Sequence, residues 1–390
     1  MPRFASTLSL AALLTVAGCA IYGATAPVAK LPPQPAALAA RPGGVGDADS
    51  IRYVIHVSID GLRPDAVQRQ SAADLPAFAR LRVESAFTQN ARTDVDYRNT
   101  LPNHTAQLTG RGVVGSDGHN WTVNTDPAPG VTLGSNKGDY VVSVFDVVHD
   151  AGLRTAAYVS KSKFSLFDVS YDQDHGAPDE TGDDDGRDKI DTFVYDPDSE
   201  ALVARLAADL RADPPAYTFL HVRDPDASGH VYTWSVRANS PYMHAVQDAD
   251  ARLGVLMDLV ESDPRLRGRT VLIVTADHGG TGRNHYAERQ TNYTVPFYVW
   301  GPGIPSADLY ALNSDTRADP GTENVGFDAA MQPIRNGDAT NLALSLLGLD
   351  PVPGSTIGHD HPLRVRADAV PPPDSTRPAS VSSATGQPRP

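Results

Sequence analysis

The chain has 390 residues, of which 41% are hydrophobic, so it is long enough for one large domain or two smaller domains with a real core. Its formal net charge of −14 argues against a surface that binds nucleic-acid polymers or anionic membranes, because such a surface needs a basic patch. A small anionic substrate stays possible, because bound metal ions would change the local field.

The N-terminus has the pattern of an export signal. Residues 1–19, MPRFASTLSLAALLTVAGC, place Arg3 before an apolar run that is too short to span a bilayer. Cys19 is the only cysteine and follows Val-Ala-Gly, which resembles the signal of a bacterial lipoprotein. We therefore expect a lipid on Cys19 and a location on the periplasmic face of a bacterial membrane. If Cys19 is not lipidated, the protein would be periplasmic or secreted.

Composition divides the rest of the chain into a folded part and two flanking segments. Residues 20–50 are rich in Ala, Pro and Gly and read as a tether without a core, and residues 367–390 read as a disordered tail. The folded domain is then 51–366. Inside it, the acidic insertion 172–191 is typical of a solvated loop, with calcium binding or a lid over the substrate as less favoured alternatives.

Short apolar runs alternate with helical patterns inside this domain. The runs that predict buried strands are 52–60, 155–160, 217–222, 270–277 and 295–301. The patterns that predict helices are 146–152, 200–212 and 242–261. This alternation predicts an α/β fold with a mostly parallel central sheet and helices on both faces. Ligands of such sheets bind beyond the carboxyl ends of the strands.

Residues suited to metal binding gather where those strands end. Asp60 follows the first strand, and Asp226 and His230 follow the third in DPDASGH, which we interpret as a small flexible turn with Asp224 as a structural residue. Adjacent Asp277 and His278 follow the fourth strand in TADHGG.

A further histidine would complete the set. His285 is preferred over His359 and His361, which lie near the end of the domain. Three aspartates and three histidines would then provide mixed oxygen and nitrogen ligands, which suit zinc and not calcium. Two such ions can clamp an in-line displacement at phosphorus.

The stretch RNTLPNHTAQLTG supplies a candidate nucleophile. Pro102 suits the first turn of a helix that runs to about Thr109, which places Thr100 just ahead of the helix N-terminus, where anions are favoured. Coordination to a metal would lower the pKa of the Thr100 hydroxyl and make it a nucleophile. The alternative is that Thr100 only caps the helix.

Five motifs together resemble a known family. The motifs SIDGLRPD, NTLPNHTAQLTGR, DPDASGH, TADHGG and a later His285 followed by VPFYVWGPG occur in this order. They are similar to those of the type I phosphodiesterase/nucleotide pyrophosphatase branch of the alkaline phosphatase superfamily. The resemblance implies an alkaline-phosphatase-like fold and two Zn²⁺ per chain.

The resemblance also implies a role for each residue. Thr100 matches the nucleophile, which forms a phosphothreonine intermediate that water then hydrolyses. Asn120 resembles an asparagine that hydrogen-bonds a phosphoryl oxygen, with Asn103 as the fallback. One zinc would be held by Asp60, Thr100, Asp277 and His278, and the other by Asp226, His230 and His285.

We thus expect a two-zinc phosphodiesterase or nucleotide pyrophosphatase that acts on a small phosphate ester or nucleotide. The alternatives are a phosphomonoesterase of the same superfamily and a non-catalytic envelope lipoprotein on this fold. Arg63, Arg98 and Arg283 are candidate substrate contacts. The Cys/Ser-x-Pro-x-Arg motif of sulfatases is absent from the sequence, which disfavours sulfate esters.

Overall fold

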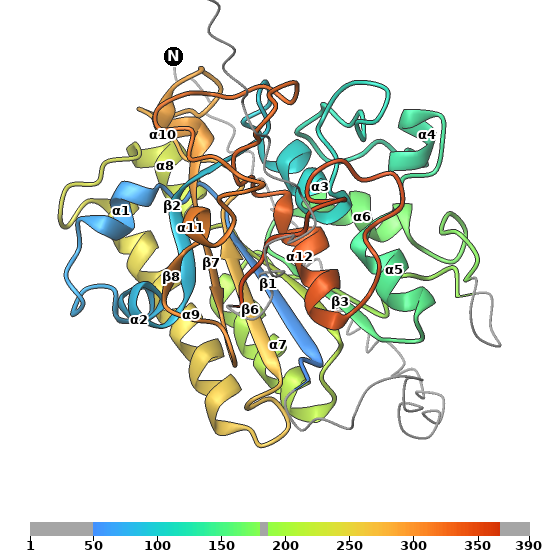
Figure 1. Cartoon of the computed structure of the whole chain (residues 1–390), viewed down its shortest axis with the longest axis horizontal. Coiled ribbons are helices and arrows are strands. Elements are labelled where there is room, and N and C mark those ends of the chain that lie inside the picture. Colours follow the sequence, from blue (N-terminus) through green and yellow to red (C-terminus); the bar gives the residue numbers. More distant parts are fainter. Residues whose placement is uncertain (1–49, 180–185, 367–390) are drawn as a thin grey trace, which may run out of the picture. The chain divides into compact units, whose positions relative to one another are not determined.

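The computed structural model of the chain describes residues 50–179 and 186–366 (Figure 1). The predicted signal with Cys19, the tether up to residue 49 and the tail 367–390 lie outside the described residues. None of the helices within the described ranges combines the length and apolarity needed to cross a bilayer.

The central element of the described part is an eight-stranded sheet with the strand order β4-β3-β5-β1-β6-β7-β2-β8. Strand β7 is antiparallel to both of its neighbours, and the other pairs are parallel. The mostly parallel sheet that the sequence predicts is therefore confirmed. The strands are β1 (Tyr53–Ile59), β2 (Ala86–Arg92), β3 (Thr155–Val159), β4 (Thr192–Tyr195), β5 (Tyr217–Val222), β6 (Thr270–Thr275), β7 (Thr294–Trp300) and β8 (Ala307–Asp308).

Helices cover the sheet in two layers (Figure 1). The long helix α9 packs with α2 and α7 in one layer, and α12 packs with α3 and α5 in the other. The helices of the described residues are α1 (Pro64–Gln68), α2 (Pro76–Glu84), α3 (Thr100–Thr109), α4 (Leu133–Lys137), α5 (Val144–Asp150), α6 (Ser165–Ser170), α7 (Ser199–Ala212), α8 (Asp224–Tyr232), α9 (Pro241–Ser262), α10 (Gln290–Tyr293), α11 (Leu309–Leu312) and α12 (Asp338–Leu347), with a 3-10 turn, η1, at Ser162–Phe164.

The five predicted strands and three predicted helices are all present, with ends shifted by two residues or fewer. The structure corrects one local prediction, because DPDASGH is the helix α8 and not a flexible turn. Pro225 fits the first turn of a helix, and the acidic side chains of Asp224 and Asp226 are favourable beside its N-terminal dipole.

The arrangement of strands explains why chemistry gathers at one edge. Strand β1 lies between β5 and β6, and β3 lies on the other side of β5. Because these four strands are parallel, the segments that follow them begin at the same edge of the sheet. Those segments start with Asp60, with α8, with Asp277 and with the turn that contains Lys161.

Candidate metal centre

The predicted metal ligands converge in two overlapping groups. Asp60, Asp277 and His278 form one, and Asp226, His278 and His285 form the other; in each group one ligand atom per residue lies within 4.8 Å of the rest. All five residues are buried. His278 Nε2 joins the groups, since it lies 3.5 Å from Asp60 Oδ1 and 4.0 Å from Asp226 Oδ1.

His230 extends the second group from helix α8. Asp226 and His230 are four residues apart and therefore share one face of the helix. His230 Nε2 lies 3.3 Å from Asp226 Oδ1. The His230 ring also contacts His285, with ring centroids 5.1 Å apart.

Thr100 stands at the start of helix α3. It is the first helical residue, one position later along the helix than the sequence suggests, and the capping position belongs to Asn99, whose side chain makes no capping bond. Thr100 Oγ1 lies 3.4 Å from His278 Nε2, and the hydroxyl is buried with it. The Thr100 side chain therefore faces the first group and does not cap the helix.

Three histidines are oriented in the same way. The Nδ1 atoms of His230, His278 and His285 hydrogen-bond backbone carbonyl oxygens of Arg283, Gly279 and Arg98, respectively. A carbonyl oxygen only accepts, so each Nδ1 carries the proton and each Nε2 keeps a free lone pair. Such outer contacts fix the ring orientation of metal-binding histidines.

Three buried carboxylates are each satisfied on one side only. Asp60 Oδ1, Asp226 Oδ1 and Asp277 Oδ2 are buried without a hydrogen bond. Buried polar atoms are normally hydrogen-bonded, and each orphan calls for an explanation. Three orphans beside three free Nε2 atoms fit bound cations, and the mixed oxygen and nitrogen set fits zinc.

The remaining carboxylate oxygens are held by the protein. Asp60 Oδ2 and Asp226 Oδ2 each accept a hydrogen bond of 2.6 Å from Lys161 Nζ. His221 Nε2 lies 2.9 Å from Asp60 Oδ2. Asp277 Oδ1 accepts from the backbone N–H of Gly61 and of His278, at 3.0 and 2.9 Å.

The pKa shifts reflect the burial of these carboxylates and the repulsion between their charges. Burial and then the Asp60 charge raise the pKa of Asp277 well above its usual value. Burial also opposes ionisation of Asp60, but Lys161 and His221 outweigh it and hold the pKa of Asp60 well below its usual value. Burial, followed by His278, lowers the pKa of His285 to about 2, so this ring is a neutral ligand. The centre thus has an excess of negative charge that cations would relieve.

Gly61 makes the close approach of two strands' ends possible. Its φ is +71°, and an added Cβ would lie 2.9 Å from the Asp226 Cα. Only glycine tolerates both conditions. The Gly61 carbonyl also accepts a hydrogen bond from Trp234 Nε1, and the Trp234 ring packs on His230 with centroids 4.9 Å apart.

Several residues of the centre are absent from the sequence-based set. These residues are Lys161, Lys163 and His221. From the sequence alone, the two lysines would be assigned to a surface turn and His221 to the interior of a strand. The available signal is position, because Lys161 and Lys163 directly follow β3 at the same edge as the aspartates. Asn124 is a further residue that the sequence-based set lacks. Its Oδ1 accepts a 2.9 Å hydrogen bond from the backbone N–H of Leu101 in the first turn of α3.

Two other residues that the sequence suggests as substrate contacts, Asn103 and Arg63, bond to groups of the protein itself. Asn103 Oδ1 accepts from the Asp94 backbone at 2.9 Å and thus supports the start of α3. Arg63 pairs with Asp65 at 2.7 Å. Asn120 lies in the left-handed region with φ 60°, on the loop that reaches α3 through His119, whose Nε2 is 3.1 Å from the Pro102 carbonyl. The role of the Asn120 side chain stays a prediction.

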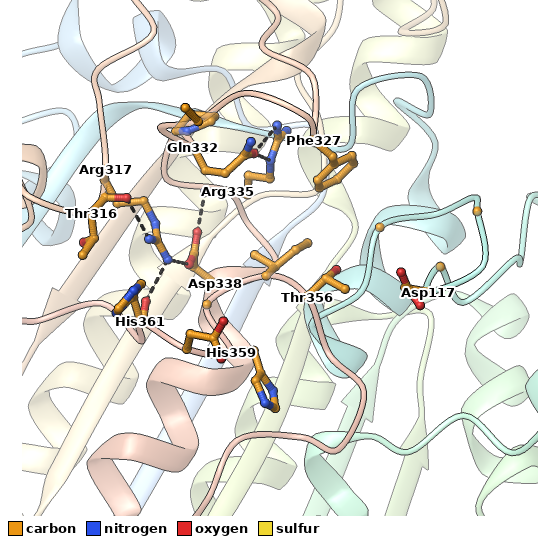
Figure 2. A pocket seen from close by; sticks show the side chains of 18 of the residues that line it. Asp117, Thr316, Arg317, Phe327, Gln332, Arg335, Asp338, Thr356, His359 and His361 are labelled. Carbon is orange, nitrogen blue, oxygen red and sulfur yellow. Dashed lines mark hydrogen bonds and ion pairs between the residues drawn. The ribbon is translucent and has the colours of Figure 1, made fainter.

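The alternative histidines lie apart from this centre. His359 and His361 line a cavity of about 460 Å³ whose wall also includes Arg317, Arg335 and Asp338 (Figure 2). Arg317 donates to Asp338 at 2.8 Å and to the His361 carbonyl at 2.9 Å. The structure therefore places His285, and not these two histidines, with Asp226 and His278.

The chain matches one known protein family and shares its fold with solved structures. The family model described as type I phosphodiesterase/nucleotide pyrophosphatase matches residues 54–296. No curated protein matches the chain. Murine ectonucleotide pyrophosphatase/phosphodiesterase 5, solved in an inactive form in complex with AMP, superposes with a TM-score of 0.51 at 15% identity, over 77% of this chain and 96% of that chain.

Two further solved structures have different chemistry. The lipoteichoic acid synthase LtaP of Listeria monocytogenes has a TM-score of 0.51 at 15% identity, over 81% of this chain and 75% of that chain. A 2-O glycosaminoglycan sulfatase has a TM-score of 0.50 at 12% identity, over 79% and 73% of the two chains. At such identities the likeness establishes the fold, which is alkaline-phosphatase-like, and leaves the substrate to be argued from the site.

Proposed function

Because the chain belongs to the type I phosphodiesterase/nucleotide pyrophosphatase family, we propose that it is a two-zinc phosphoric ester hydrolase with Thr100 as its nucleophile. The observation that carries this proposal is the set of three buried, unbonded carboxylate oxygens near three unprotonated histidine Nε2 atoms, one of which contacts the Thr100 hydroxyl. A non-catalytic lipoprotein has no need to keep these atoms unpaired, since each costs free energy in a folded protein.

Each metal would have its own ligands. Asp60, Thr100, Asp277 and His278 would hold one zinc ion, and Asp226, His230 and His285 the other. When bound, the two ions would supply Lewis acidity, which lowers the pKa of a coordinated hydroxyl and stabilises charge on phosphate oxygens.

The proposed reaction has two displacements. Thr100 Oγ1 attacks phosphorus, the bond from phosphorus to the leaving oxygen breaks, and that oxygen leaves as an alcohol or a phosphate. Water then attacks the phosphothreonine, so that the bond between Thr100 and phosphorus breaks and the hydroxyl returns. The positive end of the α3 dipole at Thr100 would favour the anionic phosphoryl group, and Asn120 would donate to one of its oxygens.

The substrate class in this proposal is a small phosphate ester or a nucleotide. The family supports diesters and nucleotide pyrophosphates, and the murine neighbour was solved with AMP. A phosphomonoesterase is the second candidate, and the two lysines of the turn after β3 favour it, because cations favour a doubly charged phosphoryl group. The proposed location stays an exported lipoprotein carrying lipid on Cys19, which mass spectrometry of the mature N-terminus would test.

The decisive experiment measures hydrolysis of bis-p-nitrophenyl phosphate and p-nitrophenyl phosphate by the zinc-loaded protein, beside Thr100→Ala. We expect turnover by the wild type and none by the variant, which should keep its fold and its zinc, as measured by circular dichroism and metal analysis. Full activity of Thr100→Ala would refute the nucleophile. Less than one zinc per chain after careful purification would revive the non-catalytic alternative.

A further inference from the structure

Two lysines reach the centre from a single turn after strand β3. Lys161 follows Ser160, and η1 then carries Lys163 and Phe164. Phe164 is fully buried, and its ring packs on His221 and His104 with centroid distances of 4.3 and 4.8 Å. The turn is therefore anchored in the core, and the two ammonium groups are held beside the metal ligands.

Lys161 ties the two metal groups together. Its Nζ donates to Asp60 of the first group and to Asp226 of the second, at 2.6 Å each. Both contacts involve Oδ2, while the Oδ1 atoms stay unbonded. Lys161 and the proposed metal ions would therefore use different oxygens of the same aspartates, so Lys161 can stay in place when metal binds.

Lys163 differs from Lys161 in its partners. Its Nζ donates to the Asn124 carbonyl at 2.8 Å and lies 3.3 Å from Asn124 Oδ1. Among the described residues it forms no ion pair, since the ion pairs of this centre all involve Lys161 or a histidine. Asn124 Oδ1 also accepts from Leu101, the residue after Thr100, so Lys163 lies one side chain away from the first turn of α3.

This arrangement places an ammonium group that has no carboxylate partner in contact with Asn124, which itself contacts the residue after the candidate nucleophile. Two divalent ions and Lys161 would already exceed the charge of the three carboxylates, and Lys163 adds another cation. A phosphate diester carries one negative charge on its non-bridging oxygens, whereas an ionised monoester carries two. A cation near phosphorus therefore favours the monoester, both when it binds and when its phosphoryl group sits on Thr100.

From this we infer that Lys163 is a specificity-determining residue that selects substrates with a terminal, doubly ionised phosphoryl group, so that the enzyme prefers phosphate monoesters to diesters. This inference rests on the proposed function. In the favoured reaction the Thr100–phosphorus bond forms and the ester bond breaks, and the alcohol leaves with one proton. Water then releases inorganic phosphate and restores the Thr100 hydroxyl.

The test compares kcat/KM for p-nitrophenyl phosphate and for bis-p-nitrophenyl phosphate, which share a leaving group. We expect the zinc-loaded wild type to prefer the monoester, and Lys163→Met to lose about 10- to 100-fold of its monoester kcat/KM with little change for the diester. Lys163→Arg should keep the preference. Lys137→Met is the matched control, because Lys137 likewise forms no ion pair and donates to backbone carbonyls, those of Ser116 and Gly118.

A binding experiment provides a readout that does not depend on turnover. Calorimetry with zinc-loaded Thr100→Ala should give tighter binding of orthophosphate than of dimethyl phosphate at pH 8. Adding Lys163→Met should reduce the ratio of the two affinities, orthophosphate over dimethyl phosphate, by at least about tenfold. Equal orthophosphate affinity in the two variants would overturn the inference, as would a wild type that prefers the diester.

The two proposals fail in different ways. Diester turnover that depends on Thr100 but shows no effect of Lys163 would leave the proposed function standing and reject the selection by Lys163. No turnover of either ester, with zinc bound, would reject the proposed function and with it the substrate preference, and the orthophosphate titration would then report only whether Lys163 contributes to phosphate binding. If Lys163→Met does not fold, Lys163→Gln in the same two assays replaces it.

Discussion

Two regions of this molecule hold buried aspartates whose surroundings differ. Asp338, beside the cavity of Figure 2, has both oxygens satisfied: Oδ1 by Arg317 at 2.8 Å and Oδ2 by the backbone N–H of Arg335 at 2.7 Å. In the metal centre, Asp60, Asp226 and Asp277 each keep one oxygen unbonded. Both regions contain histidines and both are polar. The carboxylate of Asp338 is satisfied within the protein, whereas convergent unpaired carboxylates have the arrangement that a cation site requires.

The largest expected effect separates the two regions by activity. Asp277→Asn keeps the shape of the side chain but removes a charged ligand, so kcat/KM for p-nitrophenyl esters should fall by more than about 100-fold, beyond the usual loss from an outer-contact mutation. The zinc content should fall as well. Asp338→Asn should change kcat/KM by less than tenfold and keep the zinc, as assayed side by side. A large activity loss in Asp338→Asn with unchanged stability would break the comparison.

A second prediction concerns stability with and without metal. The raised pKa of Asp277 means that its ionisation opposes folding above its ordinary pKa of 3.8. In the metal-free protein at pH 8, Asp277→Asn should therefore raise the free energy of unfolding by about 1 kcal/mol or more. In saturating zinc the same change should lower it, because zinc binding to the folded state is weakened.

Asp338→Asn is the reference for this prediction. It should lower the free energy of unfolding by about 1–3 kcal/mol under both conditions, since it weakens buried hydrogen bonds that involve no metal. Urea unfolding with a chelator and with excess zinc measures all four values. The same sign for Asp277→Asn in both conditions would contradict the role assigned to its free oxygen.

The smallest effect comes from a histidine whose two nitrogens are both bonded. His119 Nε2 faces the Pro102 carbonyl and Nδ1 accepts from the backbone N–H of Trp121, so neither nitrogen is available to a metal. Burial lowers the pKa of His119 to about 3 from its ordinary 6.5. Below pH 6.5 the unfolded chain takes up a proton that the folded chain refuses, so stability falls as the pH drops toward 3.

The expected contribution is at most about 1.4 kcal/mol per pH unit for this one group. His119→Gln should reduce the slope of unfolding free energy against pH between 6.5 and 4, as followed by urea unfolding of the metal-free protein. An unchanged slope would mean that His119 is accessible to protons in the folded state.

The sequence predicts the parts of the centre that follow directly from strand ends. Asp60 and Asp277 follow apolar runs of β-branched residues, and parallel pairing brings those ends together. Asp226 and His230 are also found in this way, although their helix is taken for a turn because the polar DPDASGH lacks an apolar face. Strands β2, β4 and β8 are missed for a related reason, since they are polar, short or half-exposed.

The electrostatic support of the centre is not local and cannot be predicted from spacing. Lys161 lies far along the chain from both Asp60 and Asp226, and its bridging contact depends on the order β3-β5-β1 within the sheet. His221 lies inside an apolar strand and would be interpreted as a core residue. The pairing of Arg317 with Asp338 likewise depends on how distant segments pack, so sequence alone cannot distinguish a satisfied carboxylate from an unsatisfied one.

The exposure of His230 has a consequence for the order in which the centre would release its metal ions. Its side chain is 37% exposed, whereas those of His278 and His285 are 0% and 1% exposed. An ion in the second group would therefore have one ligand that can swing outward into solvent, whereas the protein ligands of an ion in the first group are all buried. We expect the enclosed ion to leave slowly and the other quickly, so that a dilute chelator yields a half-loaded protein before an empty one.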